Sequence, residues 1–327
     1  MMSSPLDLRN EVSQDKDLCI VDGDLTELIG ALGLKVVEVK VVSPFVSQSN
    51  PRAVYKIRLE NGEFFKARIF SNPQSAERVH KLSSYLADLN ISRSIGLLGK
   101  AVLFDWVDGF HVPLECMDRK ILTASGVLFA QIHAPRIHPE FAGKYGYRGM
   151  EILSAVRIKK SKDVLTKNRI KEIRSLGLLT PPEADVLTDL LLDLRLDDHE
   201  VSIIATDFCP ENLVVTKFGE VYLIDTEGLV VHSLGFDFAR LLYRWPMTQS
   251  QRRIFMEGYA SLSGRKPPPV DLRYWLLTIL VESVMYRHAH PYLDEERPLE
   301  LLRCCASLGR EFLNCDLCDF TGGRLCS

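Results

Sequence analysis

An amide and a carboxylate, Asn212 and Asp225, flank a stretch that is predicted to form a β-hairpin. Residues 213–224 contain two short apolar segments, and Gly219 supplies a permissive backbone in the turn between them. In an antiparallel hairpin, the residue before the first strand and the residue after the second meet at the same open end, and Asn212 and Asp225 hold those positions. Because amide and carboxylate oxygens are hard ligands that suit Mg²⁺, the sequence predicts a Mg²⁺ site there.

A second carboxylate, Asp207, lies five residues before Asn212 in a loop that contains Pro210. This D-x-x-x-x-N spacing resembles the catalytic loop of kinases, in which the Asp accepts or orients the attacking hydroxyl and the Asn and a downstream Asp hold magnesium. Such a carboxylate needs only to be ionised and positioned, because phosphoryl transfer depends mainly on alignment and charge neutralisation. Glu227, two residues after Asp225, could add a further metal contact.

Each of these residues also has a simpler explanation, because Asp and Asn are common in turns and at strand ends. Their joint occurrence around one hairpin, followed by Gly235-Phe236-Asp237 and a predicted helix, favours a phosphotransferase-type site over coincidence or a decayed site. Asp237 itself is predicted to be structural, either as a cap for that helix or as a brace for the catalytic loop.

The segment from Ile203 to Arg240 resembles the aminoglycoside phosphotransferase family, whose pattern is H-G-D-x-x-x-x-N, a hairpin, I-D-x-x and a later G-x-x-x-D. It is also similar to choline and ethanolamine kinases, in which I-D-x-E and G-F-D precede a helix; the I-D-x-E here begins at Ile224. The resemblance implies an enzyme that moves the γ-phosphoryl group of ATP to a hydroxyl of a small molecule that is aminoglycoside-, amino-alcohol- or sugar-like. Asp207 would be the base, and Asn212 and Asp225 would hold Mg²⁺.

One position departs from the family pattern, because Ala205 stands where the family has His, two residues before the catalytic Asp. In kinases that His is mostly an internal hydrogen-bonding brace, so its loss does not remove the chemistry. The departure keeps open a divergent subgroup or reduced activity.

Lys66 lies in a predicted strand, residues 63–70, between apolar neighbours. An exposed position on an edge or solvent face is the usual explanation for such a lysine. The resemblance implies instead that Lys66 reaches the α- and β-phosphates of ATP and that Glu77, in the following helix, holds it. Arg68 has the same side-chain parity and is the rival cation, which the local sequence does not distinguish from Lys66.

Residues 103–109 resemble the linker between the two lobes of a kinase. Backbone groups of Asp105 to Val107 would bond the edge of the adenine, while Trp106 either sandwiches the ring or belongs to the core. The loop over residues 43–53 holds the place of the phosphate-covering glycine loop but contains no glycine. Its backbone N–H groups and serine hydroxyls could still meet phosphate.

The order of the predicted elements is typical of an α+β, bilobal protein-kinase-like fold, with a small β-rich N-lobe and a larger, mainly helical C-lobe. Residues 1–22 form a loose arm, 23–107 the nucleotide-binding N-lobe and 108–327 the C-lobe with the catalytic loop, metal ligands and substrate site. Asn61-Gly62 predicts a hairpin, and Asp24 is predicted to cap a short helix. The predicted strands are 35–43, 53–59, 63–70, 95–98 and 101–107, and the predicted helices are 75–90, 122–133, 149–159, 182–196, 251–263, 271–288 and 299–313.

The sequence says least about which residues bind the acceptor substrate. Residues 135–175 are basic, which indicates either a solvated helical face or a surface for an anionic substrate or partner. His133 is predicted to be structural. Acidic residues that could anchor a cationic acceptor are Glu282, Asp294, Glu295 and Glu296. A protein-directed kinase and a non-catalytic nucleotide-binding pseudokinase remain alternatives on the same fold, and neither the acceptor nor the oligomeric state can be read from the sequence.

The overall composition limits the classes of protein and partner that fit this sequence. The 327 residues are 46% hydrophobic, which is enough for two lobes, and the net charge of −3 argues against a nucleic-acid partner. Apolar runs are too short to span a membrane, and the polar start lacks a signal peptide, so we expect a cytoplasmic protein. The eight cysteines include Cys315 and Cys318, a C-x-x-C that indicates either reduced thiols or, with two others, a metal site.

Overall fold

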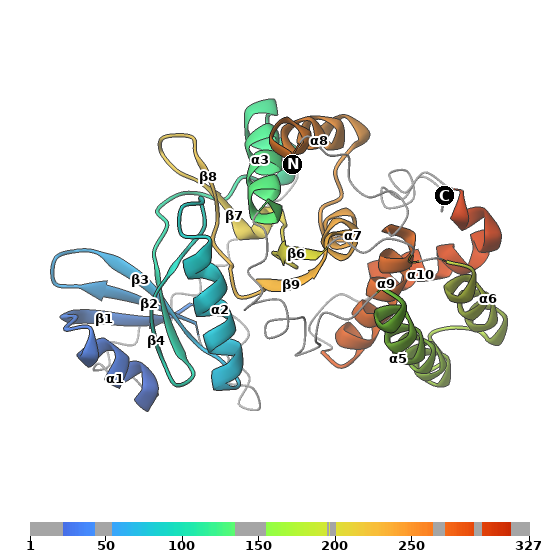
Figure 1. The fold of residues 1–327 in the computed structure, drawn as a ribbon, viewed down its shortest axis with the longest axis horizontal. Helices are drawn as coiled ribbons and strands as arrows, with labels where there is room; N and C mark the ends of the chain where they lie inside the picture. Colours follow the sequence, from blue (N-terminus) through green and yellow to red (C-terminus); the bar gives the residue numbers. More distant parts are fainter. Residues whose placement is uncertain are drawn as a thin grey trace, which may run out of the picture. The chain divides into compact units, whose positions relative to one another are not determined.

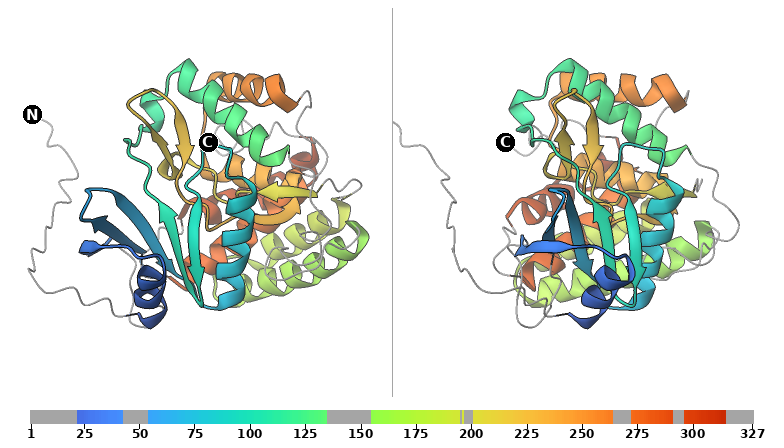
Figure 2. Two further views of the ribbon diagram at one scale, coloured as in Figure 1. Left: turned by 60° about the vertical axis from the view of Figure 1, so that its left-hand side comes forward. Right: turned by 90° about the vertical axis from the view of Figure 1, so that its left-hand side faces the viewer.

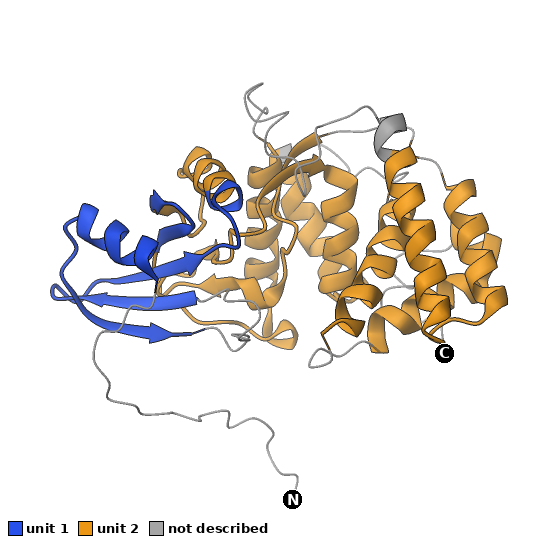
Figure 3. Ribbon diagram, turned by 90° about the horizontal axis from the view of Figure 1, so that it is seen from below, with its two compact units in different colours: residues 1–76, 96–104 blue, residues 77–95, 105–327 orange. Residues whose placement is uncertain are grey.

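The structure, a computed structural model, describes residues 22–42, 54–134, 155–194, 196, 201–263, 272–290 and 296–314 (Figure 1). Two compact units comprise residues 1–76 with 96–104, and residues 77–95 with 105–327 (Figure 3). The predictions for the N-terminal arm before Asp22, the loop over residues 43–53, the acidic residues Asp294 and Glu295, and Cys315 and Cys318 lie outside the described residues.

The N-terminal part of the chain forms a five-stranded sheet with the strand order β1-β2-β3-β5-β4 and also includes the helices α1 and α2. β1 pairs with β2 and β2 with β3, each antiparallel. This is the predicted small β-rich part of a protein-kinase-like fold. Its elements are α1 (Gly23–Ala31), β1 (Val36–Val41), β2 (Val54–Leu59), β3 (Phe64–Ile69), α2 (Pro73–Tyr85), β4 (Ser94–Leu98) and β5 (Ala101–Asp105).

The hairpin between β2 and β3 turns at Asn61-Gly62, as predicted. Gly62 has a φ of 86°, a left-handed backbone that glycine adopts without steric cost. The N–H of Leu59 donates to the carbonyl of Glu63 at 2.9 Å, which closes the turn. The hairpin sets the register of β3, in which Lys66 pairs with Lys56 of β2.

Asp24 does not cap α1, which corrects the prediction. The N-cap is Asp22, whose carboxylate accepts from the N–H of Leu25 at 3.3 Å. The carboxylate of Asp24 instead accepts from the N–H of Lys100 at 2.8 Å, in the turn between β4 and β5. Asp24 therefore ties α1 to a segment distant in sequence, a contact that no local pattern could reveal.

The second unit is mainly helical and contains two small antiparallel ladders (Figures 1 and 2). β6 pairs with β9, and β7 pairs with β8 in the predicted hairpin. The β6–β9 ladder was not predicted. The elements are α3 (Arg119–His133), α5 (Ala155–Ser175), α6 (Pro181–Asp193), β6 (Val201–Ile204), β7 (Leu213–Val215), β8 (Val221–Leu223), β9 (Val230–Ser233), α7 (Leu234–Arg244), α8 (Gln249–Ser263), α9 (Leu272–His288) and α10 (Glu296–Leu308), with 3₁₀ turns at Leu114–Cys116, Pro210–Asn212 and Gly309–Leu313.

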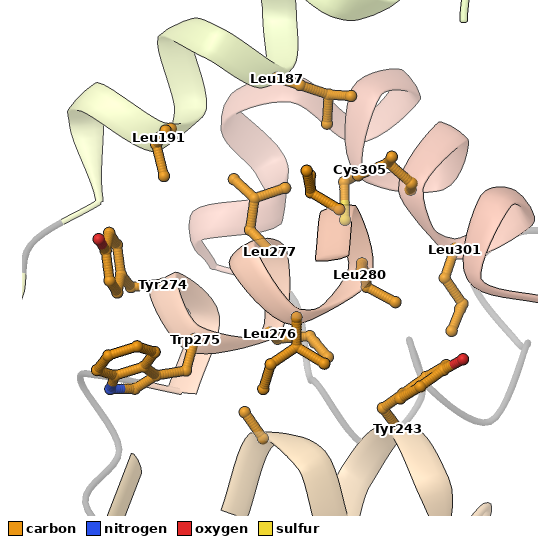
Figure 4. Packing of buried hydrophobic residues seen from close by; sticks show 14 of the residues in the cluster. Leu187, Leu191, Tyr243, Tyr274, Trp275, Leu276, Leu277, Leu280, Leu301 and Cys305 are labelled. Atoms are coloured by element: carbon orange, nitrogen blue, oxygen red, sulfur yellow. The ribbon is translucent and has the colours of Figure 1, made fainter. Parts of the chain in front are cut away.

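Two hydrophobic clusters hold this unit together. One surrounds α9, where Trp275 and Leu277 are fully buried among side chains of α6, α7 and α10 (Figure 4). The other lies behind the predicted catalytic loop and includes Phe129, Phe208 and Trp245. Burial of Phe208, the residue after Asp207, anchors the loop in this second cluster.

Helices α3 and α8 lie side by side at unusually close range (Figures 1 and 2). A Cβ at Gly126 of α3 would collide with the carbonyl of Phe255, and a Cβ at Gly258 of α8 would collide with the carbonyl of Thr123. Glycine at both positions therefore permits backbone-to-backbone contact. This contact fixes α3, whose last residue is His133.

Cysteines in α10 differ in state. Cys304 takes part in a disulfide, whereas the adjacent Cys305 is buried and is not disulfide-bonded. Within the described part of the chain, no three His, Cys, Asp or Glu side chains gather closely enough to hold a metal ion by themselves. None of the described helices is both long and apolar enough to cross a bilayer.

Candidate active site

The β7–β8 hairpin places Asn212 and Asp225 at its open end. Leu213 pairs with Leu223, and the N–H of Ile224 donates to the carbonyl of Asn212 at 2.9 Å, which extends the ladder by one step. Asp225 follows directly. The local hydrogen bonding of the hairpin is therefore what brings these two side chains to one end of it.

Asn212 connects the hairpin to Asp207. Its Nδ2 donates to the backbone carbonyl of Asp207 at 2.9 Å and lies 3.4 Å from the Asp207 Oδ2. With the amide nitrogen facing Asp207, the amide oxygen remains as a possible ligand. On the other strand, Oδ1 of Asp225 accepts from the N–H of Glu227 at 3.3 Å, and Nη2 of Arg78 reaches the Glu227 carbonyl at 3.5 Å.

One face of α7 holds the catalytic loop. Asp237, Arg240 and Arg244 are spaced i, i+3 and i+7, which places them on the same side of the helix. Oδ2 of Asp237 accepts from the N–H of Ala205 at 2.9 Å. Nη2 of Arg240 lies 3.2 Å and Nε of Arg244 lies 3.0 Å from Oδ1 of Asp207. Asp237 is thus the loop brace, and two arginines bind the carboxylate of Asp207.

The two arginines were missed by sequence reasoning. Their spacing from Asp237 was the available signal, because residues three and seven positions along a helix share its face. Burial disfavours the charged form of Arg244, but the combined interactions with Asp207, Cys209 and Glu211 outweigh it, and the pKa of Arg244 is raised. The guanidinium and carboxylate thus stabilise each other beside the loop.

His133 supports Asp237 from behind. Its Nε2 lies 3.1 Å from Oδ2 of Asp237, and its Nδ1 lies 3.2 Å from the hydroxyl of Tyr259. Burial and the charge of Asp237 raise the pKa of Tyr259 to about 12. With Ala205 in the loop, the chain of contacts runs from Tyr259 through His133 and Asp237 to the Ala205 backbone. His133 is therefore structural, as predicted.

Thr206, the residue before Asp207, has a φ of 55°, the left-handed region that β-branched residues rarely adopt. Its hydroxyl donates to the carbonyl of Gly228 at 2.9 Å. A Cβ at Gly228 would lie 2.5 Å from the carbonyl oxygen of Ala205, so only glycine allows this approach. The left-handed backbone of Thr206 and its hydrogen bond to Gly228 therefore fix the orientation of the backbone at Asp207.

Asp105, predicted for the nucleotide linker, is tied to the segment before β4. Its Oδ1 accepts from the N–H of Arg93 at 2.7 Å, and its carbonyl accepts from the hydroxyl of Ser92 at 3.0 Å. Burial raises the pKa of Asp105, although its bonds to Arg93 oppose the shift. The carbonyl of Ser92 in turn accepts from the Thr226 hydroxyl at 3.0 Å, so this segment also supports the strand end at Asp225.

The remaining nucleotide residues are placed separately. Lys66 lies on β3, with its Nζ 5.4 Å from the ring centroid of Phe104 in the same unit. Glu77 lies on α2 and belongs to the second unit, so its pairing with Lys66 stays a prediction. Val107 is half-buried in the segment after β5.

The structure describes two of the acidic candidates for the acceptor side, Glu282 and Glu296. Oε1 of Glu282 on α9 lies 2.8 Å from Nζ of Lys162, and both side chains are largely buried. Glu296 is exposed at the start of α10. Lys162 therefore does not belong to a solvated basic face, and Lys159 also pairs internally, at 2.8 Å from Asp163.

Cys209 lies between Asp207 and Asn212, and its chemistry can be tested directly. Burial and the charge of Asp207 raise the pKa of its thiol to about 12. Since the thiolate is the reactive form, only about one thiol in ten thousand is ionised at pH 8. We expect iodoacetamide at pH 8 to alkylate the exposed Cys116 and to spare Cys209, as mapped by peptide mass spectrometry. Equal labelling of both cysteines in the folded protein would contradict the buried loop geometry.

The donors at the open end of the hairpin fit a Mg²⁺–nucleotide. Asn212 supplies an amide oxygen and Asp225 a carboxylate, both hard ligands. Mg²⁺ normally keeps few protein ligands and completes its shell with phosphate oxygens and water, so a site with one carboxylate and one amide is sufficient. This donor set suits a metal that arrives with a nucleotide better than a resident metal centre.

No protein-family model matches this sequence, and no curated protein matches it either. Solved structures do. An aminoglycoside phosphotransferase, APH(2'')-Ib bound to ADP, has a TM-score of 0.60 at 14% identity and covers 89% of this chain and 99% of its own. The amicoumacin kinase hAmiN, in complex with AMP-PNP, Ca²⁺ and Ami, has a TM-score of 0.57 at 13% identity over 90% and 96% of the two chains.

The choline kinase LicA from Streptococcus pneumoniae has a TM-score of 0.51 at 15% identity and covers 92% of this chain and 94% of its own. The same architecture thus recurs over most of each chain, with a five-stranded sheet followed by a mainly helical part. The chain therefore has the protein-kinase-like fold that aminoglycoside phosphotransferases and choline kinases share, as the order of its predicted elements indicated.

Proposed function

We propose that this chain is an ATP-dependent kinase that phosphorylates a hydroxyl of a small molecule. The observation that carries the proposal lies at the open end of β7–β8, where Asn212 donates to Asp207 and Asp225 follows the partner strand β8. The structural relatives support it, because one binds ADP and another binds AMP-PNP with Ca²⁺. Residence in the cytoplasm, where ATP is supplied, is part of the proposal.

In this proposal Asp207 is the catalytic base. The acceptor hydroxyl attacks the γ-phosphorus, the bond from that phosphorus to the bridging oxygen breaks, ADP leaves, and the hydroxyl proton passes to the Asp207 carboxylate. Arg240 and Arg244 position that carboxylate through its Oδ1. Because Oδ1 accepts from Nη2 of Arg240 and lies 3.0 Å from Nε of Arg244, we assign the proton to Oδ2.

The nucleotide contacts in this proposal follow the family resemblance. Asn212 and Asp225 would hold Mg²⁺, which neutralises phosphate charge when it is bound. Lys66, supported by Glu77, would bind the α- and β-phosphates, and the backbone of Asp105 and Val107 would bond the adenine edge. These roles rest on the resemblance.

A nucleotide-binding pseudokinase is the second candidate. It is favoured by the two arginines on Asp207, which occupy Oδ1 and could hold the carboxylate away from an acceptor. Ala205, where the family has His, also favours the pseudokinase. The two candidates agree on Mg²⁺–ATP binding and differ in turnover.

Replacement of Asp225 by Asn tests the nucleotide site. We expect Mg²⁺–ATP to raise the melting temperature of the wild type and to do so far less in Asp225→Asn, because a carboxylate ligand is lost. Acceptor-dependent ADP release should fall by about a hundredfold or more, consistent with the loss of one charge-stabilising contact. Glu220→Gln, an exposed carboxylate of the same hairpin, is the matched control. Unchanged nucleotide stabilisation in Asp225→Asn would remove Asp225 from the site, and nucleotide binding without ADP release would favour the pseudokinase.

A further inference from the structure

β1 is an edge strand of the five-stranded sheet. The strand order β1-β2-β3-β5-β4 places β2 on one side of it, and no strand in the described part of the chain pairs with its other side. The N–H of Val42 donates to the carbonyl of Val54 at 2.9 Å, toward β2. Because backbone groups alternate in direction along an antiparallel strand, the N–H and C=O groups of Val39 and Val41 point toward the open side. A further strand could pair with them there.

Apolar side chains of β1 are exposed at this edge. Val37 is 41% exposed and Val41 is 58% exposed, and Val42, directly after the strand, is 43% exposed. In the register with β2, Val41 lies opposite Tyr55, whose side chain is buried. Val41 therefore continues the buried face of the sheet to an edge that is left exposed. An exposed apolar edge strand is a place at which proteins associate.

The sequence of this strand is self-complementary. Residues 36–42 read V-V-E-V-K-V-V, which is symmetrical about Val39 except that the charges of Glu38 and Lys40 are opposite. When a second copy pairs antiparallel with this strand about Val39, Glu38 of each copy lies opposite Lys40 of the other, and Val37 lies opposite Val41. The two Val39 residues, whose backbone groups point outward, then exchange a pair of hydrogen bonds.

The charges on β1 suit such a pairing. A charged side chain or a bulge on an edge strand commonly keeps other strands away, and β1 has a bulge between Val36 and Glu38. The bulge lies at the start of the strand, however, and the register of residues 38–41 is regular. Nζ of Lys40 lies 3.0 Å from Oε1 of Glu38 in the same chain, and the Lys40 side chain is 70% exposed. In the symmetrical pairing the carboxylates and ammonium groups of the two copies alternate, so the charges attract the partner strand.

We infer that β1 is a homodimer interface, at which two copies of this chain pair antiparallel through residues 36–42 about a two-fold axis at Val39 and join their sheets edge to edge. The contact is isologous, because both copies use the same strand, so it closes as a dimer and does not extend into a fibre. The inference does not depend on the proposed kinase activity. One pair of short strands buries less surface than most stable interfaces, so we expect a weak dimer, with a dissociation constant of roughly 1–100 µM.

Sedimentation velocity across a concentration series that brackets this range tests the inference. We expect the wild type to shift from monomer to dimer as its concentration rises. Lys40→Glu and Glu38→Lys should each weaken self-association by about tenfold or more, because both opposite-charge pairs become like-charge pairs. An equimolar mixture of the two variants should recover a dimer, because the glutamates of one variant then face the lysines of the other. Recovery on mixing is expected only if these positions face each other across the interface.

Val39→Pro tests the backbone pairing without a change of charge. Proline removes the N–H that points to the open side and is tolerated on edge strands, so the pairing with β2 should persist while the dimer is lost. This variant is also needed because Oε2 of Glu38 lies 2.8 Å from Nε of Arg58 in the same chain, an ion pair that Glu38→Lys removes. Thermal melting of every variant shows whether its fold is intact.

Lys160→Glu is the matched control, because it reverses the charge of an exposed lysine on α5, outside β1. It should leave the dissociation constant unchanged. A wild type that stays monomeric throughout the series would overturn the inference, since the edge of β1 would then be covered within the chain or belong to a different partner. A dimer that folded Lys40→Glu and Val39→Pro retain at wild-type affinity would overturn it as well, because the copies would then pair through another surface.

Discussion

Asp207→Asn is expected to lower kcat for acceptor phosphorylation by about a thousandfold, within the range found when a general base is removed. The amide keeps the size of the carboxylate but cannot take the hydroxyl proton. Binding of Mg²⁺–ATP should persist, because the proposed metal ligands are Asn212 and Asp225. A coupled assay of ADP release, with nucleotide affinity measured separately by calorimetry, distinguishes loss of the base from loss of the nucleotide.

A fall in kcat for Asp207→Asn could also come from the two arginines that contact this carboxylate, so a control variant is needed. Asp207→Asn also removes a carboxylate that Arg240 and Arg244 contact at 3.2 Å and 3.0 Å, so the loop could shift. Glu211→Gln removes an exposed carboxylate from the 3₁₀ turn that follows Asp207 in the same loop, and it controls for the local loss of charge. We expect Glu211→Gln to keep wild-type turnover. If Asp207→Asn retains more than a tenth of the wild-type kcat, Asp207 is not the base.

The open end of the β7–β8 hairpin in the candidate site could be anticipated because its causes are local. Asn212 and Asp225 meet because the hairpin between them pairs in one register, and short-range chemistry sets that register. The same is true of Asn61-Gly62, where a left-handed glycine closes the turn between β2 and β3. The spacing along the chain was therefore enough to predict that Asn212 and Asp225 lie at the same end of the hairpin.

The supports of the site could not be anticipated because their causes are distant in sequence. β6 and β9 are four-residue strands, too short to show a period, and each is defined only by its partner. From the sequence alone, Arg240 and Arg244 resemble ordinary helix residues, because no local pattern shows that the catalytic loop lies beside α7. Asp24 was predicted as a helix cap from local pattern, yet its partner is Lys100, 76 residues away. Polar side chains that serve tertiary contacts resemble surface residues in a single sequence.

The buried pair of Lys162 and Glu282 is the sharpest case of such a tertiary contact, and it predicts the largest loss of stability. Their side chains are 3% and 12% exposed, and the pair joins α5 to α9 across 120 residues of sequence. Lys162→Met keeps the apolar stem but leaves the carboxylate of Glu282 buried without its cation. We expect the free energy of unfolding to fall by about 3–5 kcal/mol, the usual cost of breaking a buried pair from one side. Urea denaturation followed by tryptophan fluorescence measures it, since Trp275 lies buried on α9.

The double variant decides whether the pair itself or the packing around it carries this effect. Well-packed apolar residues often replace a buried ion pair at little cost, so Lys162→Met with Glu282→Leu should be more stable than either single variant. Lys160→Met, an exposed neighbour on α5, should change the free energy of unfolding by less than about 0.5 kcal/mol. Additive losses in the double variant would show that the two side chains act independently. A rescue would show that neutralisation of Glu282 by Lys162 is what stabilises the α5–α9 contact, and so that this carboxylate is committed to the fold and is not an anchor for a cationic acceptor.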